Sequence, residues 1–367
     1  MAVAVMGIGV CGCFPTSSGL SYRELIARAA TMAYGDAGIT PEELDGAVSV
    51  EEDFVSGYSI ADEYVPDQLG MVRKPIYTIC GEYLQGVCSA VMQIRTGRYR
   101  ALVVEGYSKA SNILNKDELL HFAYDPVWDR LGVSPHYLAG IEMQHFLCST
   151  SWSEEEVASF AALCRSNALQ NPLAPYGAKV GRKEVLAART VSSPVTELMV
   201  ARPADAAIVV VLGTEEFARE RSRHPVYITG TGWSSGSSII QRRVHAASVG
   251  TTLAAKMAYA EAGITSPGLD ADVYYVSDLY AHRGLMHLEA LGLGKEELPS
   301  VNPDGGSLGM GDLFEANGGA RLYDAVRQLR GEAGAHQVDG AQCAIVQGWR
   351  GLPTDSSAVV ILESEVR

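Results

Sequence analysis

The chain is poor in the features that mark membrane, nucleic-acid-binding and secreted proteins. No apolar run approaches the roughly 18 residues that a membrane-spanning helix needs, so we expect no membrane span. The formal net charge of −14 disfavours a nucleic-acid partner, because phosphates are bound by basic surfaces. The first residues lack a basic leader, so we expect no secretory signal.

Motifs for metal binding are also missing from the sequence. The seven cysteines form no C-x-x-C pair, and the eight histidines form no H-E-x-x-H array. We therefore expect no metal site. Unpaired thiols are typical of a reducing compartment, which predicts a cytoplasmic protein.

The chain does contain an internal repeat. Residues 29–40 read AATMAYGDAGIT and residues 254–265 read AAKMAYAEAGIT, so nine of twelve positions are identical. Small and apolar residues recur at helical spacing in both copies, and Gly38 and Gly263 stand where a helix can end in the left-handed conformation. Apolar runs typical of buried strands lie on either side. The sequence therefore predicts two strand–helix–strand units.

The likeness between the two parts continues further along the chain. A helical pattern at 83–97 precedes an apolar strand pattern at 101–108, and a second helical pattern at 318–331 precedes another at 343–350. We expect two similar α/β halves that meet about a pseudo-twofold axis, with their loops and helix N-termini converging at the joint.

These patterns divide the chain into three parts. Residues 1–110 with 200–222 form the first half, and residues 223–367 form the second. Residues 111–199 are rich in loops and short helices. Such an insertion is typical of a binding cap or of a subunit contact, and one segment can serve as both.

Cys80 stands in the segment PIYTICGEYLQGV, between a predicted strand and a predicted helix. A thiol at a helix start has a lowered pKa and is held exposed, as an activated nucleophile is. The alternative is a small residue that fills a tight turn.

Several segments together resemble the thiolase superfamily, on the side of the sterol-carrier-protein-type and archaeal thiolases. They are the Cys80 loop with its helix and the strand ALVVEGYS, the segment VSDLYAHRGLMHLEALGLG, and the loop VNPDGGSLGMGD with the helix after it. The resemblance implies two βαβαβαββ halves in a five-layered αβαβα core, plus a loop domain. It also implies a coenzyme A thioester as substrate and no covalently bound cofactor.

The family's catalytic motifs are altered in this sequence. The resemblance implies an acylated cysteine, two histidines or a histidine with an asparagine, and often a second cysteine. Here Asp312 occupies the Gly-His-Pro histidine position, and residues 277–280 read Ser-Asp-Leu-Tyr at the other histidine motif. The C-terminal loop 347–351 contains no cysteine. Carboxylates can serve as general bases when their pKa is suitable.

The candidate residues follow from these positions. We predict that catalysis uses Cys80, Asp312, Asp278 and Glu315, with Glu82 as a further carboxylate. Hydrogen-bond support for an oxyanion would come from Tyr83, Tyr280, His282 and Gly351. Coenzyme A would contact Lys179, Arg182, Lys183, Gly305 and Gly306.

Three functions stay open at this point. The first is an acyltransferase that makes or breaks a carbon–carbon bond in a coenzyme A thioester through acyl-Cys80. The second is a retro-aldolase that cleaves a β-hydroxyacyl-CoA without an acyl-enzyme. The third is a non-catalytic subunit of a complex. The resemblance also implies a homodimer and, in relatives of the archaeal type, a small companion protein with a zinc ribbon and an oligonucleotide-binding-type barrel.

Overall fold

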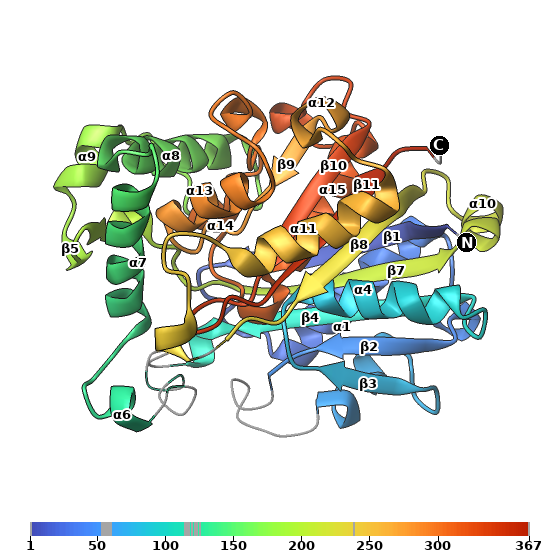
Figure 1. The fold of residues 1–367 in the computed structure, drawn as a ribbon. Helices are drawn as coiled ribbons and strands as arrows, with labels where there is room; N and C mark the ends of the chain where they lie inside the picture. The colour runs from blue at the N-terminus through green and yellow to red at the C-terminus, as the bar shows by residue number, and fades with distance from the viewer. Residues whose placement is uncertain are drawn as a thin grey trace.

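The computed structural model describes residues 2–52, 61–113, 118, 120, 124, 126–237 and 239–365. Its centre is a nine-stranded sheet (Figure 1) with the order β3-β2-β4-β7-β1-β8-β11-β10-β9. The strands are β1 Val3–Phe14, β2 Gly46–Val50, β3 Ile76–Ile79, β4 Ala101–Lys109, β7 Asp205–Thr214, β8 Val226–Ser234, β9 Val273–Tyr275, β10 Cys343–Trp349 and β11 Ser357–Glu363.

The strand order is symmetric about the junction of β1 and β8. Going outward, β7 and β11 are antiparallel to their inner neighbours, and β4 and β10 pair in parallel with β2 and β9. A single bridge between Tyr274 and Val301 takes the place that β3 has in the first half. Within the described sheet, the strands of the two halves pair directly at three residue pairs, those of Val3 to Val5 with β8. The described sheet therefore shows the predicted duplication.

Helices lie on both outer faces of the sheet and between its two halves. Helix α1 (Tyr22–Ala37) packs on β1 and β7, and α11 (Val249–Ala262) packs on β8 and β11. Helices α4 (Tyr83–Arg95) and α15 (Asn317–Leu329) contact each other and strands of both halves. The five-layered thiolase-like core is thus confirmed.

Close packing of α1 and α11 against a strand explains the internal sequence repeat. A Cβ atom built on Gly9 would come within 2.2 Å of the carbonyl oxygen of Ala29, and one on Gly232 within 2.2 Å of that of Ala254. Only glycine on the strand and small residues on the helix permit this approach. Both helices end in left-handed glycines, with φ of 66° at Gly38 and 73° at Gly263, as predicted.

The segment between the halves packs helices against the second half. Helix α7 (Pro135–Ser149) and helix α8 (Glu154–Asn167) both contact α13 (Ala281–Ala290). Part of the predicted domain 111–199 lies outside the described residues, and its status as a separate domain stays a prediction. The remaining elements are α3 Pro66–Leu69, α6 Pro126–Asp129, α9 Arg182–Ala187, β5 Thr190–Ser192, β6 Val195–Thr196, α10 Glu215–Arg221, α12 Pro267–Asp270 and α14 Gly306–Met310.

A buried ion cluster ties α7 to the second half. Glu142 on α7 accepts hydrogen bonds from Arg283 at 2.9 Å and from Arg243 at 2.6 Å, and Arg283 also reaches Asp355 at 3.1 Å. Burial opposes ionisation of Glu142, but the two arginines outweigh it and hold its pKa well below the usual range. Among the described residues, no helix is long and apolar enough to cross a membrane.

Candidate active site

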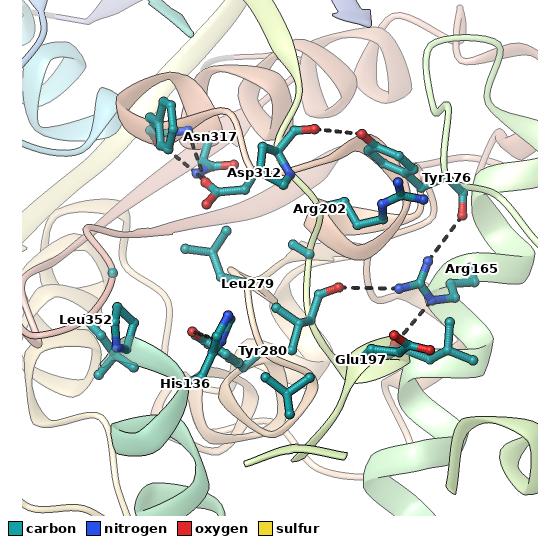
Figure 2. A pocket seen from close by; sticks show the side chains of 18 of the residues that line it. His136, Arg165, Tyr176, Glu197, Arg202, Leu279, Tyr280, Asp312, Asn317 and Leu352 are labelled. Carbon is teal, nitrogen blue, oxygen red and sulfur yellow. Dashed lines mark hydrogen bonds between the residues drawn. The ribbon is translucent and has the colours of Figure 1, made fainter. Parts of the chain in front are cut away.

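A cavity of about 890 Å³ opens between the loop segment and the catalytic loops of the second half (Figure 2). Asp312 and Asn317 lie on one side of it, Tyr280 and His136 lie on another, and Leu279 is between them. Its apolar wall with a few convergent polar groups is typical of a small-molecule site. The site is therefore built from residues far apart in the sequence, as the predicted convergence of loops requires.

Asp312 is fixed at the start of α15. Its backbone N–H donates to the carbonyl of Arg202 at 2.7 Å. Its Oδ1 accepts hydrogen bonds from the backbone N–H of Phe314 at 3.1 Å and from Nδ2 of Asn317 at 2.9 Å. These contacts hold the carboxyl group at the cavity wall, with 8% of the residue exposed. The structure thus places the predicted Asp312 where it can contact a ligand.

Tyr280 forms a pair with a histidine that sequence reasoning missed. Tyr280 precedes α13, and its hydroxyl oxygen lies 3.0 Å from Nδ1 of His136 near the start of α7. Which atom donates depends on the histidine tautomer. Because the two residues are 144 positions apart, no local motif in the sequence joins them. Such a pair can accept or deliver a proton.

Arg350 brings a positive charge into the same cavity. Its guanidinium forms an ion pair with Glu52 and lies 3.9 Å from Oε1 of Glu315. Burial lowers the pKa of Arg350 to about 10, which still leaves it cationic at neutral pH. Glu315 lines the cavity, as predicted, whereas Glu52 and Arg350 were not among the predicted site residues.

Cys80 follows the end of β3, where the carbonyl of Ile79 accepts a hydrogen bond at 3.2 Å from the N–H of Glu51, the neighbour of the cavity-lining Glu52. A helix does begin just after Cys80, with Glu82 as the N-cap of α4, so the predicted strand-to-helix turn is confirmed. The thiol is exposed, but Cys80 is not among the described residues that line the cavity. Glu82 is 1% exposed, and burial raises its pKa to about 7. Its Oε2 accepts from the N–H of Leu84 at 2.7 Å, which is a capping role.

Three further candidates are buried and are not among the described residues that line the cavity, so their contact with substrate stays a prediction. Asp278 accepts from the N–H of Ser307 at 2.6 Å and caps α14, and burial raises its pKa. The hydroxyl of Tyr83 donates to the carbonyl of Val104 at 3.0 Å. His282 is fully buried 3.9 Å from Glu142, and burial lowers its pKa. Sequence position alone did not show which way these side chains turn.

The predicted glycines lie in different surroundings. Gly351, a predicted oxyanion residue, lines the cavity with φ of 99°. Gly305, a predicted coenzyme A contact, is buried, and a Cβ atom on it would come within 2.5 Å of Ala168, so its backbone closely approaches another part of the chain. Gly306 is likewise buried, beside Asp278.

The basic residues of the cavity differ from the predicted ones. Lys179, Arg182 and Lys183 are exposed outside its lining. The cavity is instead lined by Arg165, Arg189 and Arg202. The guanidinium of Arg202 lies 4.9 Å from the ring centre of Tyr176, a cation–π contact that holds it at the cavity wall. Among the residues that the structure describes, no group of three or more histidines, cysteines or carboxylates could hold a metal ion.

Comparisons with known proteins agree with this architecture. Residues 294–364 match the family model "Thiolase C-terminal domain-like". An acetyl-CoA acetyltransferase from Methanothermobacter thermautotrophicus is 27% identical over 88% of this chain and 90% of its own length. A 17-hydroxy-3-oxo-4-pregnene-20-carboxyl-CoA lyase from Mycobacterium tuberculosis is 25% identical over 96% of this chain and 97% of its own.

Solved structures are similar over the whole chain. An "Ltp2-ChsH2(DUF35) aldolase" superposes with a TM-score of 0.83 and 22% identity, and it covers 99% of this chain and 97% of its own. A monomeric SCP2-thiolase-like protein from Mycobacterium smegmatis gives a TM-score of 0.80 at 17% identity, over 100% of this chain and 78% of its own. The strand order, the central helices, the matched family model and these relatives together support assignment of the chain to the thiolase superfamily, and a further relative named sterol carrier protein 2, from Homo sapiens, is 24% identical over 88% of this chain and 65% of its own length.

Proposed function

We propose that the chain is a carbon–carbon lyase that splits a β-hydroxyacyl-CoA by a retro-aldol reaction. The observation that supports this choice is the content of the cavity. The Tyr280–His136 pair, Asp312 and Arg350 line it together, whereas Cys80 is not among its described lining residues. Retro-aldol cleavage needs proton transfer and enolate stabilisation, and it needs no thiol nucleophile.

The reaction would begin at the substrate's β-hydroxyl group. The Tyr280–His136 pair takes the hydroxyl proton, and the oxygen lone pair forms a carbonyl. The bond between Cα and Cβ breaks, and its electron pair passes to the thioester as an enolate. A proton then adds to Cα, which gives a shortened acyl-CoA and an aldehyde or ketone. General acid–base groups of this kind contribute about 10²–10⁴ in rate.

Arg350 and Asp312 have complementary tasks in this scheme. The positive charge of Arg350 stabilises the enolate, since a fixed charge in a cavity shielded from water interacts strongly with a developing negative charge. The proton that the Tyr280–His136 pair took from the hydroxyl is the one that adds to Cα, and Asp312, held by Phe314 and Asn317, orients the substrate for this transfer. Glu315 and Glu52 position the Arg350 guanidinium.

Acyl transfer through Cys80 is the second candidate. The thiol is exposed and stands just before α4, where the family has its nucleophile, and one relative is an acetyl-CoA acetyltransferase. Substrate could reach Cys80 from the surface. This route predicts a thioester on the sulfur, which the retro-aldol route does not form.

We also propose that the chain acts in the cytoplasm with a second copy and a companion protein. The structural relative named as an Ltp2-ChsH2(DUF35) aldolase, and a relative named as a subunit of benzoylsuccinyl-CoA thiolase, support an assembly. A companion could supply cations for the phosphates of coenzyme A. Lys179 adjoins the cavity-lining residue Ala178 and is the candidate on this chain.

The test is a product assay with a matched pair of variants. Purified protein is incubated with β-hydroxyacyl-CoA substrates, and the released carbonyl compound and shortened acyl-CoA are measured. Tyr280→Phe should lose most of the turnover, and Cys80→Ala should keep it. Loss of turnover in Cys80→Ala, together with an acyl adduct on the wild-type thiol in intact mass spectra, would favour the second candidate.

A further inference from the structure

A second hollow of about 780 Å³ lies beside the catalytic cavity. Its walls are residues 10–15 at the end of β1, the outward face of α1, and the segment 172–175. Pro175 lines both this groove and the catalytic cavity. The groove and the catalytic cavity are therefore adjacent, with Pro175 on their common border.

The lining of this groove is apolar. Phe14 is 39% exposed and Met32 is 56% exposed, and Leu173 and three prolines also line the groove. Arg28 is the one charged side chain among its described lining residues. Exposed apolar side chains that gather in one hollow are typical of a binding site for an apolar group.

The groove wall is rigid and is coupled to the catalytic loop. The N–H of Ala174 donates to the carbonyl of Asn171 at 3.0 Å. The N–H of Tyr176 donates to the carbonyl of Gly309 at 2.9 Å, and its hydroxyl donates to that of Pro203 at 2.6 Å. Gly309 lies on α14, three residues before Asp312. The wall is thus formed before any ligand binds, which reduces the entropy lost on binding.

We infer that this groove binds the apolar acyl portion of the substrate, a long or ring-bearing chain on a coenzyme A thioester. The inference rests on the proposed function, because it places the reacting carbons in the cavity. The phosphates of coenzyme A need several cations. The groove offers Arg28 alone, whereas Arg165, Arg189 and Arg202 line the cavity. The apolar end of the substrate is therefore the part that matches the groove.

Equilibrium binding tests this assignment without any turnover. Isothermal titration compares decanoyl-CoA, acetyl-CoA and decanoyl-pantetheine on the wild-type protein and on Met32→Trp, whose larger side chain fills the groove. The control is Met257→Trp, because Met257 holds the equivalent position on α11 and is 44% exposed. Binding is read without catalysis, so failure of the retro-aldol scheme would not change the outcome.

The expected result is selective for the acyl chain. Met32→Trp should weaken the binding of decanoyl-CoA and of decanoyl-pantetheine about tenfold, and the binding of acetyl-CoA less than twofold. A tenfold loss corresponds to roughly two methylene groups that are no longer buried. Met257→Trp should bind all three ligands as the wild type does. Equal weakening of acetyl-CoA and decanoyl-CoA, with decanoyl-pantetheine unaffected, would assign the groove to the nucleotide and overturn the inference. Unchanged binding of all three would also overturn it.

Discussion

The two halves of the molecule share a scaffold but differ in chemistry at equivalent loops. Glycines on β1 and β8 bring α1 and α11 equally close to the sheet. The residues that precede the two central helices in the chain differ. An exposed thiol, Cys80, comes shortly before α4, whereas Asp312, at the wall of the cavity, comes shortly before α15. The duplicated contacts preserve the fold, so the loops are free to diverge. The proposed chemistry belongs to the loops of the second half.

The largest expected effect comes from breaking the proton-transfer pair that Tyr280 of the second half forms with His136 of the segment between the halves. Tyr280→Phe removes the hydroxyl that lies 3.0 Å from His136 and retains the ring. The kcat for carbon–carbon cleavage should fall by about 10²–10⁴, because a general acid–base group is lost. The kcat of His136→Asn should fall by a similar factor, and the dependence of its kcat on pH should differ from that of the wild type. A kcat within a fewfold of the wild type in both variants would contradict the role of the pair.

The next largest effect is on stability, and it concerns the buried ion cluster of Glu142, which anchors α7 and with it His136. Glu142→Gln removes the carboxylate that Arg283 and Arg243 share and leaves Arg283 with Asp355 alone, which should lower the free energy of unfolding by about 3–5 kcal/mol at pH 7. Because the folded-state pKa of Glu142 is depressed, its contribution is present above its unfolded pKa near 4 and is lost as the pH falls below that value.

Urea unfolding at several pH values checks this prediction. The stability difference between the wild type and Glu142→Gln should be large at pH 7 and should shrink in acid. The exposed pair of Arg189 and Glu197 supplies the control, since Glu197→Gln should cost no more than about 1 kcal/mol. A difference for Glu142→Gln that is independent of pH would show that the charge is not its source.

The substitution Glu105→Gln makes the first half resemble the second and has a smaller expected effect. Glu105 on β4 is fully buried and corresponds to Gln347 on β10, and burial raises the pKa of Glu105 to about 7. For a carboxyl group with a raised pKa, wild-type stability declines as the pH rises from about 4.5 to about 7. Glu105→Gln removes that decline. The variant should gain up to about 3 kcal/mol relative to the wild type at pH 8 and should show little change at pH 4.

Thermal or urea unfolding of both proteins across this pH range measures the gain. Ser49 donates to Oε1 of Glu105 at 2.6 Å, and the glutamine oxygen can accept the same bond, so packing should be kept. A variant that is less stable than the wild type at pH 8 would mean that the charged carboxylate is well accommodated.

Much of the fold could be predicted from the sequence because it depends on local patterns. The repeat, the left-handed glycines 38 and 263, and the strand-to-helix turn at Cys80 are encoded within short segments. Asp312 was identified by its place in the catalytic loop, and it does line the cavity.

The rest of the site depends on tertiary placement. Which way Asp278 and Tyr83 turn is decided by the buried hydrogen bonds that each one makes, and no spacing rule reports this. His136 meets Tyr280 only because Glu142 anchors α7 to the second half. Arg350 is enclosed by Glu52 and Glu315 from distant loops. These contacts are non-local: Tyr280 and Glu315 stand in segments that the resemblance identified, but their partners His136, Glu52 and Arg350 carried no motif of their own.

The difference between the two halves is tested most directly by Cys80→Ala, the substitution with the smallest expected effect. We predict that single-turnover cleavage of a β-hydroxyacyl-CoA by this variant stays within about twofold of the wild-type rate, and that intact mass spectra of the wild type show no acyl group on the protein. Loss of cleavage in Cys80→Ala, with an acyl adduct on Cys80 of the wild-type protein during turnover, would contradict the account.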